Sequence, residues 1–166
     1  MKYDTYFISD NKPFPNNRLP VILYTEIFHE EKEDYGDDFL HLFRENGWGN
    51  SWRNGVYPFH HYHGEAHEVL GCAKGRVKIM LGGEGGEIYE LHKGEAVLLP
   101  AGVAHCRVES TSDFSIIGAY PHNQSPDLNK GMEEEYKVNI EKIEKVQKPV
   151  KDPVTGLDIP AVEEWK

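Results

Sequence analysis

The sequence predicts a mainly β protein, a small jelly roll of antiparallel strands with a few helices at its periphery. Two observations lead to this fold class. Between residues 55 and 120, short apolar segments follow one another closely and are separated by glycine-rich turns. Within that region the segments 76–81 and 87–91 flank the glycine-rich run 82–86, which is turn chemistry typical of a β-hairpin. Antiparallel strands at this spacing, closed on themselves, form a small jelly roll.

Length, charge and cysteine content limit the classes of protein to consider. The chain has 166 residues, 39% of them hydrophobic, which is enough for one domain with a buried core. We expect a single domain over 1–166, with N-terminal strands and a short helix (1–54), a metal-binding barrel core (55–121), and a C-terminal helix with a wrapping tail (122–166). The net charge of −10 disfavours nucleic acid and anionic membranes as partners.

The expected cellular location follows from targeting segments and cysteine content. Its first residues have no apolar signal core, and no apolar run approaches the roughly 20 residues needed to cross a bilayer. Cys72 and Cys106 are too few for a disulfide scaffold and suit a reducing compartment. We therefore expect a cytoplasmic protein.

Before the barrel, the segments 5–9 and 20–28 are rich in apolar and β-branched residues and are separated by turn-forming residues. These features predict two strands, the first at a sheet edge. Phe39, Leu42 and Phe43 share one face of a predicted short helix. Asp37 or Asp38 is the expected cap of this helix, and Asn46-Gly47 its end.

The remaining elements follow the same logic. The segment 96–99 predicts a buried strand, and 106–109 and 114–120 predict two more. The apolar residues expected to line a pocket inside the roll are Leu70, Ile79, Leu81, Leu91, Val97 and Leu99. The apolar face of a charged helix outside the barrel is predicted from Met132, Tyr136, Ile140 and Ile143. The proline-containing segment 148–166 predicts an extended tail, pinned by Trp165.

Imidazole and carboxylate groups gather in the segment 61–68. On a β-strand successive side chains point to opposite faces, so His61 and His63 project to one side and form a chelating pair. The chain can turn at Gly64 and bring back Glu68 on a neighbouring strand, and His105 follows later in the chain. Neutral imidazoles with one carboxylate suit a first-row divalent cation such as Fe, Mn, Ni, Cu or Zn.

The spacing of these residues resembles the two signature motifs of the cupin superfamily. The first motif is matched, with five, one, four and six residues between successive members, by Gly55, His61, His63, Glu68 and Gly75. The second is matched, with five, one and two residues between members, by Gly94, Pro100, Gly102 and His105. Where the second motif usually ends in Asn, this chain has Glu109.

A finer resemblance covers most of the chain. The segments 46–55, 60–61, 66–71, 118–121 and 152–165 look like the YjlB-like branch of bacterial cupins. The resemblance implies a double-stranded β-helix, the cupin barrel, that pairs as a homodimer. It also implies one divalent metal ion per chain (Fe, Mn, Ni or Zn) with open coordination positions. The implied ligands are His61, His63, Glu68 and His105.

Two charged residues follow His105 on the same predicted strand. Arg107 and Glu109 stand at i+2 and i+4, so a regular strand turns all three side chains to the barrel interior. A buried Arg and a buried carboxylate are costly unless they are paired or used. One interpretation is a structural ion pair near the barrel mouth. In the catalytic interpretation Arg107 grips an anionic or carbonyl-bearing substrate and Glu109 assists proton transfer.

Other residues near the motifs have structural and functional interpretations. His60 and His67 are expected to be solvent-exposed, with orientation of a metal ligand as the alternative. Cys72 is expected to be a small buried hydrophobe rather than a redox group, and Cys106 to face away from the metal. The residues that either wall the cavity or pack on the helix or a partner subunit are Trp48, Trp52, Arg53 and Tyr57.

These features predict a metal-dependent enzyme that acts on a small polar molecule inside the barrel. Dioxygenation with Fe needs little beyond the metal and an apolar pocket, and it is the slightly favoured reaction. Isomerisation with Mn, Ni or Zn needs an additional acid or base, for which Glu109 with Arg107 is the candidate. The alternative is a non-catalytic metallo-cupin that binds a sugar or another small metabolite. An open, uncapped coordination position distinguishes the enzyme from the binding protein.

Overall fold

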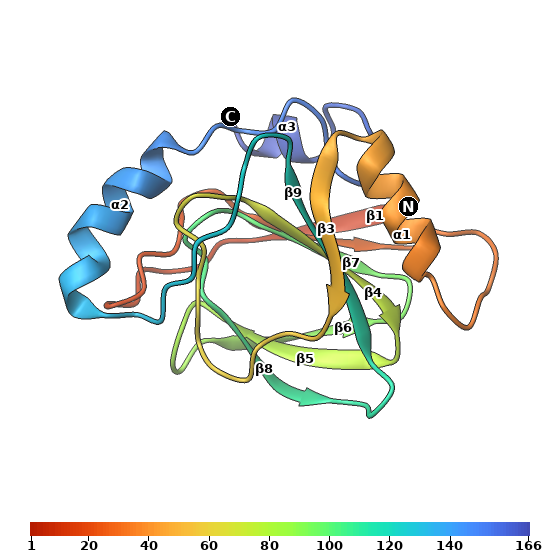
Figure 1. Cartoon of the computed structure of the whole chain (residues 1–166), viewed down its shortest axis with the longest axis horizontal. Coiled ribbons are helices and arrows are strands. Elements are labelled where there is room, and N and C mark those ends of the chain that lie inside the picture. The colour runs from red at the N-terminus through yellow and green to blue at the C-terminus, as the bar shows by residue number, and fades with distance from the viewer.

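The computed structural model describes residues 1–166 and contains two antiparallel β-sheets that face each other (Figure 1). The larger sheet has the strand order β1-β2-β7-β4-β9-β3, and the smaller has the order β6-β5-β8. The strands of the larger sheet are β1 (Lys2–Tyr6), β2 (Val21–Thr25), β3 (Trp48–Asn54), β4 (Glu68–Lys74), β7 (Ala96–Leu99) and β9 (Ser115–Pro121). Those of the smaller sheet are β5 (Arg76–Leu81), β6 (Glu87–His92) and β8 (His105–Ser110). The predicted jelly roll with a few peripheral helices is confirmed.

The N-terminal edge of the larger sheet is set by a proline. Strand β1 lies at the sheet edge, as predicted, but it ends at Tyr6 rather than near residue 9. Tyr6 pairs with Val21, the first residue of β2. The residue before Val21 is Pro20. Because proline has no N–H to donate to the ladder, β2 begins after it and β1 loses its partner there.

The barrel interior is a packed apolar core over much of its length. Strand β7 is buried on both faces: Val97 and Leu99 join the core between the two sheets, whereas Ala96 and Leu98 join a second core on the outer face of the larger sheet. This explains its continuous apolar run. Of the six residues predicted to line a pocket, only Leu70 lies on the main cavity, because the others fill the inner core.

The outer face of the larger sheet is covered by α1 (Gly36–Glu45), the C-terminal tail and the short helix α3 (Ala161–Glu164) (Figure 1). The tail is pinned as predicted, since Trp165 is fully buried and its indole N–H donates to the carbonyl of Pro20 at 2.9 Å. The predicted cap of α1 was wrong. Asp34 accepts the N–H of Gly36 at 2.7 Å, and the helix begins before Asp37 and Asp38.

Two further segments differ from the expectation. The single helical turn η1 (Glu133–Glu135) leads into α2 (Tyr136–Lys145), which lies outside the barrel as predicted. Only Asn139 and Ile143 of α2 are buried, so its apolar face is narrower than the sequence predicts. The segment 48–54 forms strand β3, which pairs with β9 and which the sequence pattern does not predict.

None of the helices combines the length and the hydrophobicity that a membrane-spanning helix needs.

Candidate metal centre

Main-chain hydrogen bonds bring the ligand-bearing segments together. His61 and His105 pair as an antiparallel bridge, with N–H to carbonyl distances of 3.2 and 2.9 Å, and Tyr62 pairs with Asn129 in the same way. The segment 61–63 is therefore extended, although it forms isolated bridges rather than a long strand. Its alternation still turns His61 and His63 to the same side, as predicted.

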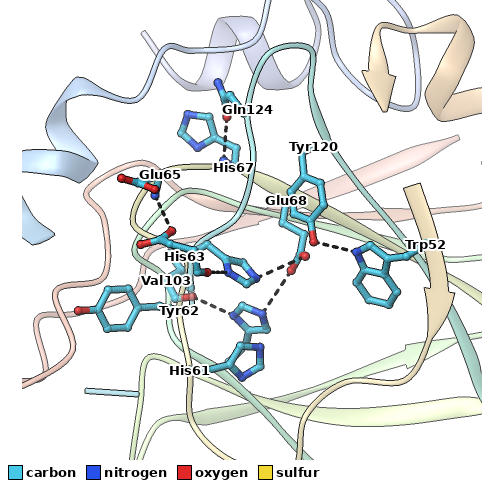
Figure 2. A network of polar contacts seen from close by, with 12 residues as sticks. Trp52, His61, Tyr62, His63, Glu65, His67, Glu68, Val103, Tyr120 and Gln124 are labelled. Carbon is cyan, nitrogen blue, oxygen red and sulfur yellow. Dashed lines mark hydrogen bonds and ion pairs between the residues drawn. The ribbon is translucent and has the colours of Figure 1, made fainter. Parts of the chain in front are cut away.

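Two of the three imidazoles, those of His63 and His105, contact the carboxylate of Glu68, the first residue of β4 (Figure 2). Nitrogen atoms of His61, His63 and His105 all lie within 4.8 Å of one another. The Nε2 atom of His63 lies 3.5 Å from Oε2 of Glu68, and that of His105 lies 3.3 Å from Oε1. Sequence positions far apart thus bring three histidines together, with the carboxylate of Glu68 against two of them, and this buried group of three histidines can bind a metal.

The other nitrogen of each ring is held by a backbone carbonyl. Nδ1 of His61 lies 3.0 Å from the carbonyl oxygen of Phe59, and Nδ1 of His105 lies 3.0 Å from that of Val103. His63 makes the same contact with the carbonyl of Asp127. A carbonyl only accepts, so each Nδ1 carries a proton, and a ring held in this way presents the Nε2 lone pair whenever it is neutral. Lone pairs facing a carboxylate repel one another unless a cation or protons lie between them, and this donor set fits a divalent metal.

The pKa values show how closely the groups interact when no metal neutralises them. Burial alone lowers the pKa of His63, but the adjacent charge of Glu68 outweighs burial and raises it to about 9. Burial, together with His105 and His63, lowers the pKa of His61 to about 3. Burial would raise the pKa of Glu68, yet His63 and His105 hold it well below its usual range.

A cavity of about 860 Å³ opens beside these four residues. The larger side chains that line it include Leu70, Tyr120, Trp52, Arg107 and Phe114. The remaining lining is largely polar and includes Asn54, Ser112, Ser115 and Asp127. The cavity is large enough for a small organic molecule and brings that molecule to the ligand cluster.

A β-bulge separates the two charged residues that follow His105. Ile79 of β5 pairs with Arg107, and Lys78 pairs with Glu109, so Val108 is an extra residue without a partner. Arg107 therefore faces the cavity as predicted, whereas Glu109 points outward on the side of Lys78. The Glu109 side chain is 60% exposed and its carboxylate lies 3.4 Å from Nζ of Lys78. The expectation that Glu109 faces the interior was wrong, because the bulge reverses the alternation.

Arg107 is fixed without a carboxylate partner. Its Nε donates to the carbonyl of Val56 at 3.0 Å and Nη1 to the hydroxyl of Ser110 at 3.4 Å. Its guanidinium carbon lies 5.7 Å from the centre of the Phe114 ring. The other arginine of the cavity, Arg53, forms an ion pair with Asp34, with 2.7 Å between Nη2 and Oδ2. Arg107 thus supplies a positive charge that no protein carboxylate neutralises.

Tyr120 stands beside Glu68 and was not predicted as a site residue. The indole N–H of Trp52 donates to its phenol oxygen at 2.7 Å (Figure 2). Burial, followed by the charge of Glu68 and a hydrogen bond to it, raises the pKa of Tyr120 far above the ordinary value. The indole of Trp52 can pack directly on the main chain of Gly118 because glycine has no side chain. A Cβ at this position would lie 2.2 Å from the indole ring. The signal available in the sequence was the alternation of Gly118 and Tyr120 on one face of β9.

Comparisons with known proteins decide the family. No family model matches the chain. It is 35% identical over 162 residues to the uncharacterized protein YjlB of Bacillus subtilis (strain 168), covering 97% of this chain and 95% of that protein. The chain belongs to the YjlB family. The resemblance of this chain to the YjlB-like branch, stated from its sequence segments, is therefore confirmed.

Three solved structures resemble the YjlB-family chain at low sequence identity. A DUF861 family protein of Thermotoga maritima has a TM-score of 0.35 and 22% identity, over 55% of this chain and 94% of that one. RmlC of Streptococcus suis, solved with dTDP-D-xylose, has a TM-score of 0.35 and 14% identity, over 72% and 74%. The dTDP-4-dehydrorhamnose 3,5-epimerase of Elizabethkingia anophelis has a TM-score of 0.35 and 15% identity, over 95% and 86%.

Two histidines of the YjlB-family protein are more buried than the sequence suggests. His67 is 1% exposed because the C-terminal tail covers it, and its ring lies 4.7 Å from that of Trp165. Its Nδ1 accepts the N–H of Ala101 at 2.9 Å, and burial lowers its pKa to about 4. His60 is half-buried against Phe14. The expectation that both histidines are solvent-exposed was wrong.

The cysteines and the aromatic segment before the first motif lie in different environments in this YjlB-family chain. Cys72 is fully buried in the inner core, as expected, and burial raises its pKa to about 12. Cys106 pairs with Met80 on the face of β8 opposite His105, as expected. Trp48 packs in the outer core beside α1. The other aromatic and basic residues of that segment line the cavity: Trp52, Arg53 and Tyr57.

Proposed function

We propose that this protein is a metal-dependent enzyme that acts on a small anionic molecule inside the barrel. The proposed ligands of one divalent ion, Fe, Mn, Ni or Zn, are His61, His63, Glu68 and His105. One observation carries the proposal: three imidazoles, each with Nδ1 held by a backbone carbonyl, place nitrogen atoms within 4.8 Å of one another on the cavity wall, and the buried carboxylate of Glu68 contacts two of them. A set of three His and one Glu leaves coordination positions open, which is typical of catalytic rather than structural metal sites.

When bound, the metal supplies Lewis-acid chemistry, or oxygen chemistry if it is iron. The surrounding residues bind and orient the substrate. Arg107 is proposed to hold its anionic group, since no carboxylate of the protein neutralises this guanidinium. Leu70 and Phe114 provide apolar contacts on the same cavity wall and exclude water from part of it.

The outward position of Glu109 bears on the choice of reaction. An isomerase needs a second acid or base near the metal, and Glu109 lies outside the cavity beside Lys78. A dioxygenase needs only the metal, a bound substrate and an apolar wall. The acid or base on which the isomerase hypothesis relied is therefore missing from the cavity, and oxygen chemistry remains the slightly favoured reaction.

The alternative of a non-catalytic binding protein is less favoured. In that case an internal ion pair of Arg107 with Glu109 would be expected to cap the open coordination position. Glu109 instead pairs with Lys78, and the cavity beside the ligands stays open. The homodimer and the cytoplasmic location implied by the sequence remain predictions. Light scattering on the purified protein tests the first.

Element-resolved metal analysis tests the proposal most directly. Protein purified without an affinity tag or chelator is compared with the His105→Ala variant and with the double variant of His61 and His63 to Ala. We expect about one metal ion per wild-type chain and a sharp loss in both variants. Iron directs the next step to oxygen-consumption assays with small acids, and Mn, Ni or Zn to isomerase substrates. Full metal content in the variants, or none in wild-type protein after reconstitution, contradicts the proposed site.

A further inference from the structure

Helix α2 buries an amide where an apolar residue is expected. It lies outside the barrel and contributes no residue to the cavity. Only two of its side chains are buried, Ile143 and Asn139, and Asn139 is 2% exposed. A buried amide costs free energy unless its donors and acceptors are paired. The partners of Asn139 therefore indicate its role.

Those partners lie on the segments that carry the metal ligands. Nδ2 of Asn139 donates to the phenol oxygen of Tyr62 at 2.7 Å and to Oδ1 of Asn129 at 3.1 Å. Tyr62, fully buried, stands between the ligands His61 and His63 (Figure 2). Asn129 exchanges both main-chain hydrogen bonds with Tyr62, at 2.9 and 3.1 Å. The amide of α2 thus binds both strands of the bridge that carries these histidines.

Asp127 connects this cluster to the ligand ring itself. Its Oδ2 accepts the amide N–H of Asn129 at 2.7 Å. Its Oδ1 accepts the main-chain N–H groups of Gly64 at 2.8 Å and Glu65 at 3.0 Å, the two residues after His63. Its own carbonyl accepts the Nδ1 proton of His63. Asp127 therefore holds His63 by the ring on one side and by the following backbone on the other.

Close approach at Gly64 allows this cluster to form. A Cβ at Gly64 would lie 3.2 Å from Oδ2 of Asp127, and 3.7 Å from polar atoms of both Asn129 and Asn139. The first of these contacts is tighter than an ordinary van der Waals contact. The three side chains therefore converge on the chain turn that directly follows His63.

We propose that Asp127 and Asn139 are positioning residues for the metal centre, and that the docking of α2 sets the orientation of His63. Asn139 fixes the Tyr62–Asn129 bridge, that bridge places Asp127, and Asp127 fixes the tautomer and ring orientation of His63. Neither residue is a metal ligand. The inference rests on the proposed metal site, and it assigns part of the affinity of that site to a helix outside the barrel.

Metal affinity of four proteins tests the inference: wild type, Asp127→Ala, Asn139→Leu and Val154→Ala. Leu has the same number and branching of side-chain heavy atoms as Asn and favours the helix, but it cannot donate to Tyr62 or Asn129. Val154 is buried in the outer core, away from the cluster, so its truncation controls for a general loss of stability. Zn²⁺ and Co²⁺ affinities are measured by chelator competition, and nitrogen-15 NMR of the Zn²⁺-loaded proteins reports which ring nitrogen of His63 carries the proton and which one binds the metal.

We expect Asp127→Ala to weaken metal binding by about 10- to 100-fold, the usual effect of removing the support of a ligand. Asn139→Leu should weaken it less but in the same direction. In both variants the proton of His63 should lose its preference for Nδ1, whereas Val154→Ala should keep the wild-type affinity and tautomer. If Asp127→Ala does not fold, Asp127→Asn gives the same comparison, because it keeps the side-chain shape and an acceptor for Gly64 and Glu65 but removes the charge and the acceptor of the Asn129 amide.

Three contrary outcomes are distinct. Wild-type protein that binds neither metal contradicts the proposed function itself. Wild-type protein that binds metal, with unchanged affinity and His63 tautomer in the variants, overturns the positioning role and leaves the metal site standing. Equal weakening by Val154→Ala would also overturn it, because the effect would then reflect stability alone.

Discussion

The Nε2 atom of His105 lies 3.3 Å from Oε1 of Glu68, and only 3% of either side chain is exposed. The second carboxylate oxygen lies 3.5 Å from Nε2 of His63. Glu68 therefore bridges two rings in a dry environment, where a change of charge on one group strongly affects the others.

Replacing Glu68 by Gln should reverse the pKa shift of His63. The wild-type pKa is about 9 because the charge of Glu68 outweighs the effect of burial. With the neutral amide only burial and weaker hydrogen bonds remain, so the pKa should fall below 6.5 in metal-free protein. NMR titration of the ring protons measures it. A pKa that stays near 9 in the variant would show that Glu68 is not the source of the shift.

The stability of metal-free protein should be greatest near pH 6.5. His61 and His67 have pKa values of about 3 and 4 in the folded state, below the ordinary 6.5, so stability falls as the pH drops from 6.5 through those values. His63 has a raised pKa of about 9, so its contribution is complete below pH 6.5 and is lost as the pH rises through 9. Urea unfolding with EDTA at pH 4.5, 6.5 and 9.5 measures both limbs. The alkaline limb should disappear in Glu68→Gln.

Removing the phenol oxygen of Tyr120 should destabilise the cavity wall. In Tyr120→Phe the indole N–H of Trp52 loses its acceptor, which costs about 1–3 kcal/mol in the free energy of unfolding. Tyr57→Phe is the matched control, since Tyr57 lines the same cavity but is half-exposed, and its change should stay within about 0.5 kcal/mol. Equal urea midpoints for the two variants would argue against a structural role for the Trp52–Tyr120 contact.

Substitutions of Arg107 and Glu109 should have different effects on the affinity for an anion. The Co²⁺-loaded protein is titrated with pyruvate, and acetone serves as the uncharged probe. Arg107→Ala should weaken pyruvate binding by about 10- to 100-fold, the loss of a hydrogen bond to a charged group, with unchanged metal content. Glu109→Gln should leave pyruvate binding unchanged, because this side chain lies outside the cavity. Equal pyruvate affinity in wild type and Arg107→Ala would return Arg107 to a structural role.

Trp165→Ala should test how firmly the tail holds the barrel. The indole is fully buried, packs on His67 and donates to Pro20, so truncation should cost about 3–5 kcal/mol of unfolding free energy. Val150→Ala, at a tail residue that is 86% exposed, should change stability by less than about 0.5 kcal/mol. Chemical denaturation compares the two. A loss below 1 kcal/mol for Trp165→Ala would mean that the tail is not part of the cooperative unit.

The ligand cluster could be predicted because strand parity is a local property. His61 and His63 share a face through simple alternation, and motif spacing supplied Glu68 and His105. The orientation of Glu109 could not be predicted in this way, because one unpaired residue, Val108, reverses the alternation after Arg107. A bulge depends on pairing with another strand and leaves no clear mark on the sequence.

Burial by segments that are distant in the sequence also could not be predicted. His67 is surrounded by polar and small residues in the sequence, and its neighbour Trp165 lies at the far end of the chain. Strand β3 was missed because its apolar residues face two different environments: Trp48 lies in the outer core, and Trp52 lies on the cavity. Alternation is hard to recognise when neither face of a strand is uniformly apolar.

Two of the three imidazoles are oriented by the carbonyl oxygens of Phe59 and Val103, groups that every amino acid possesses. The side chains at those positions can change during evolution without loss of the contact, provided that the main chain keeps its path. Selection for the metal centre would then act on backbone shape rather than on residue identity. An alignment that scores only side chains would consequently underrate both positions.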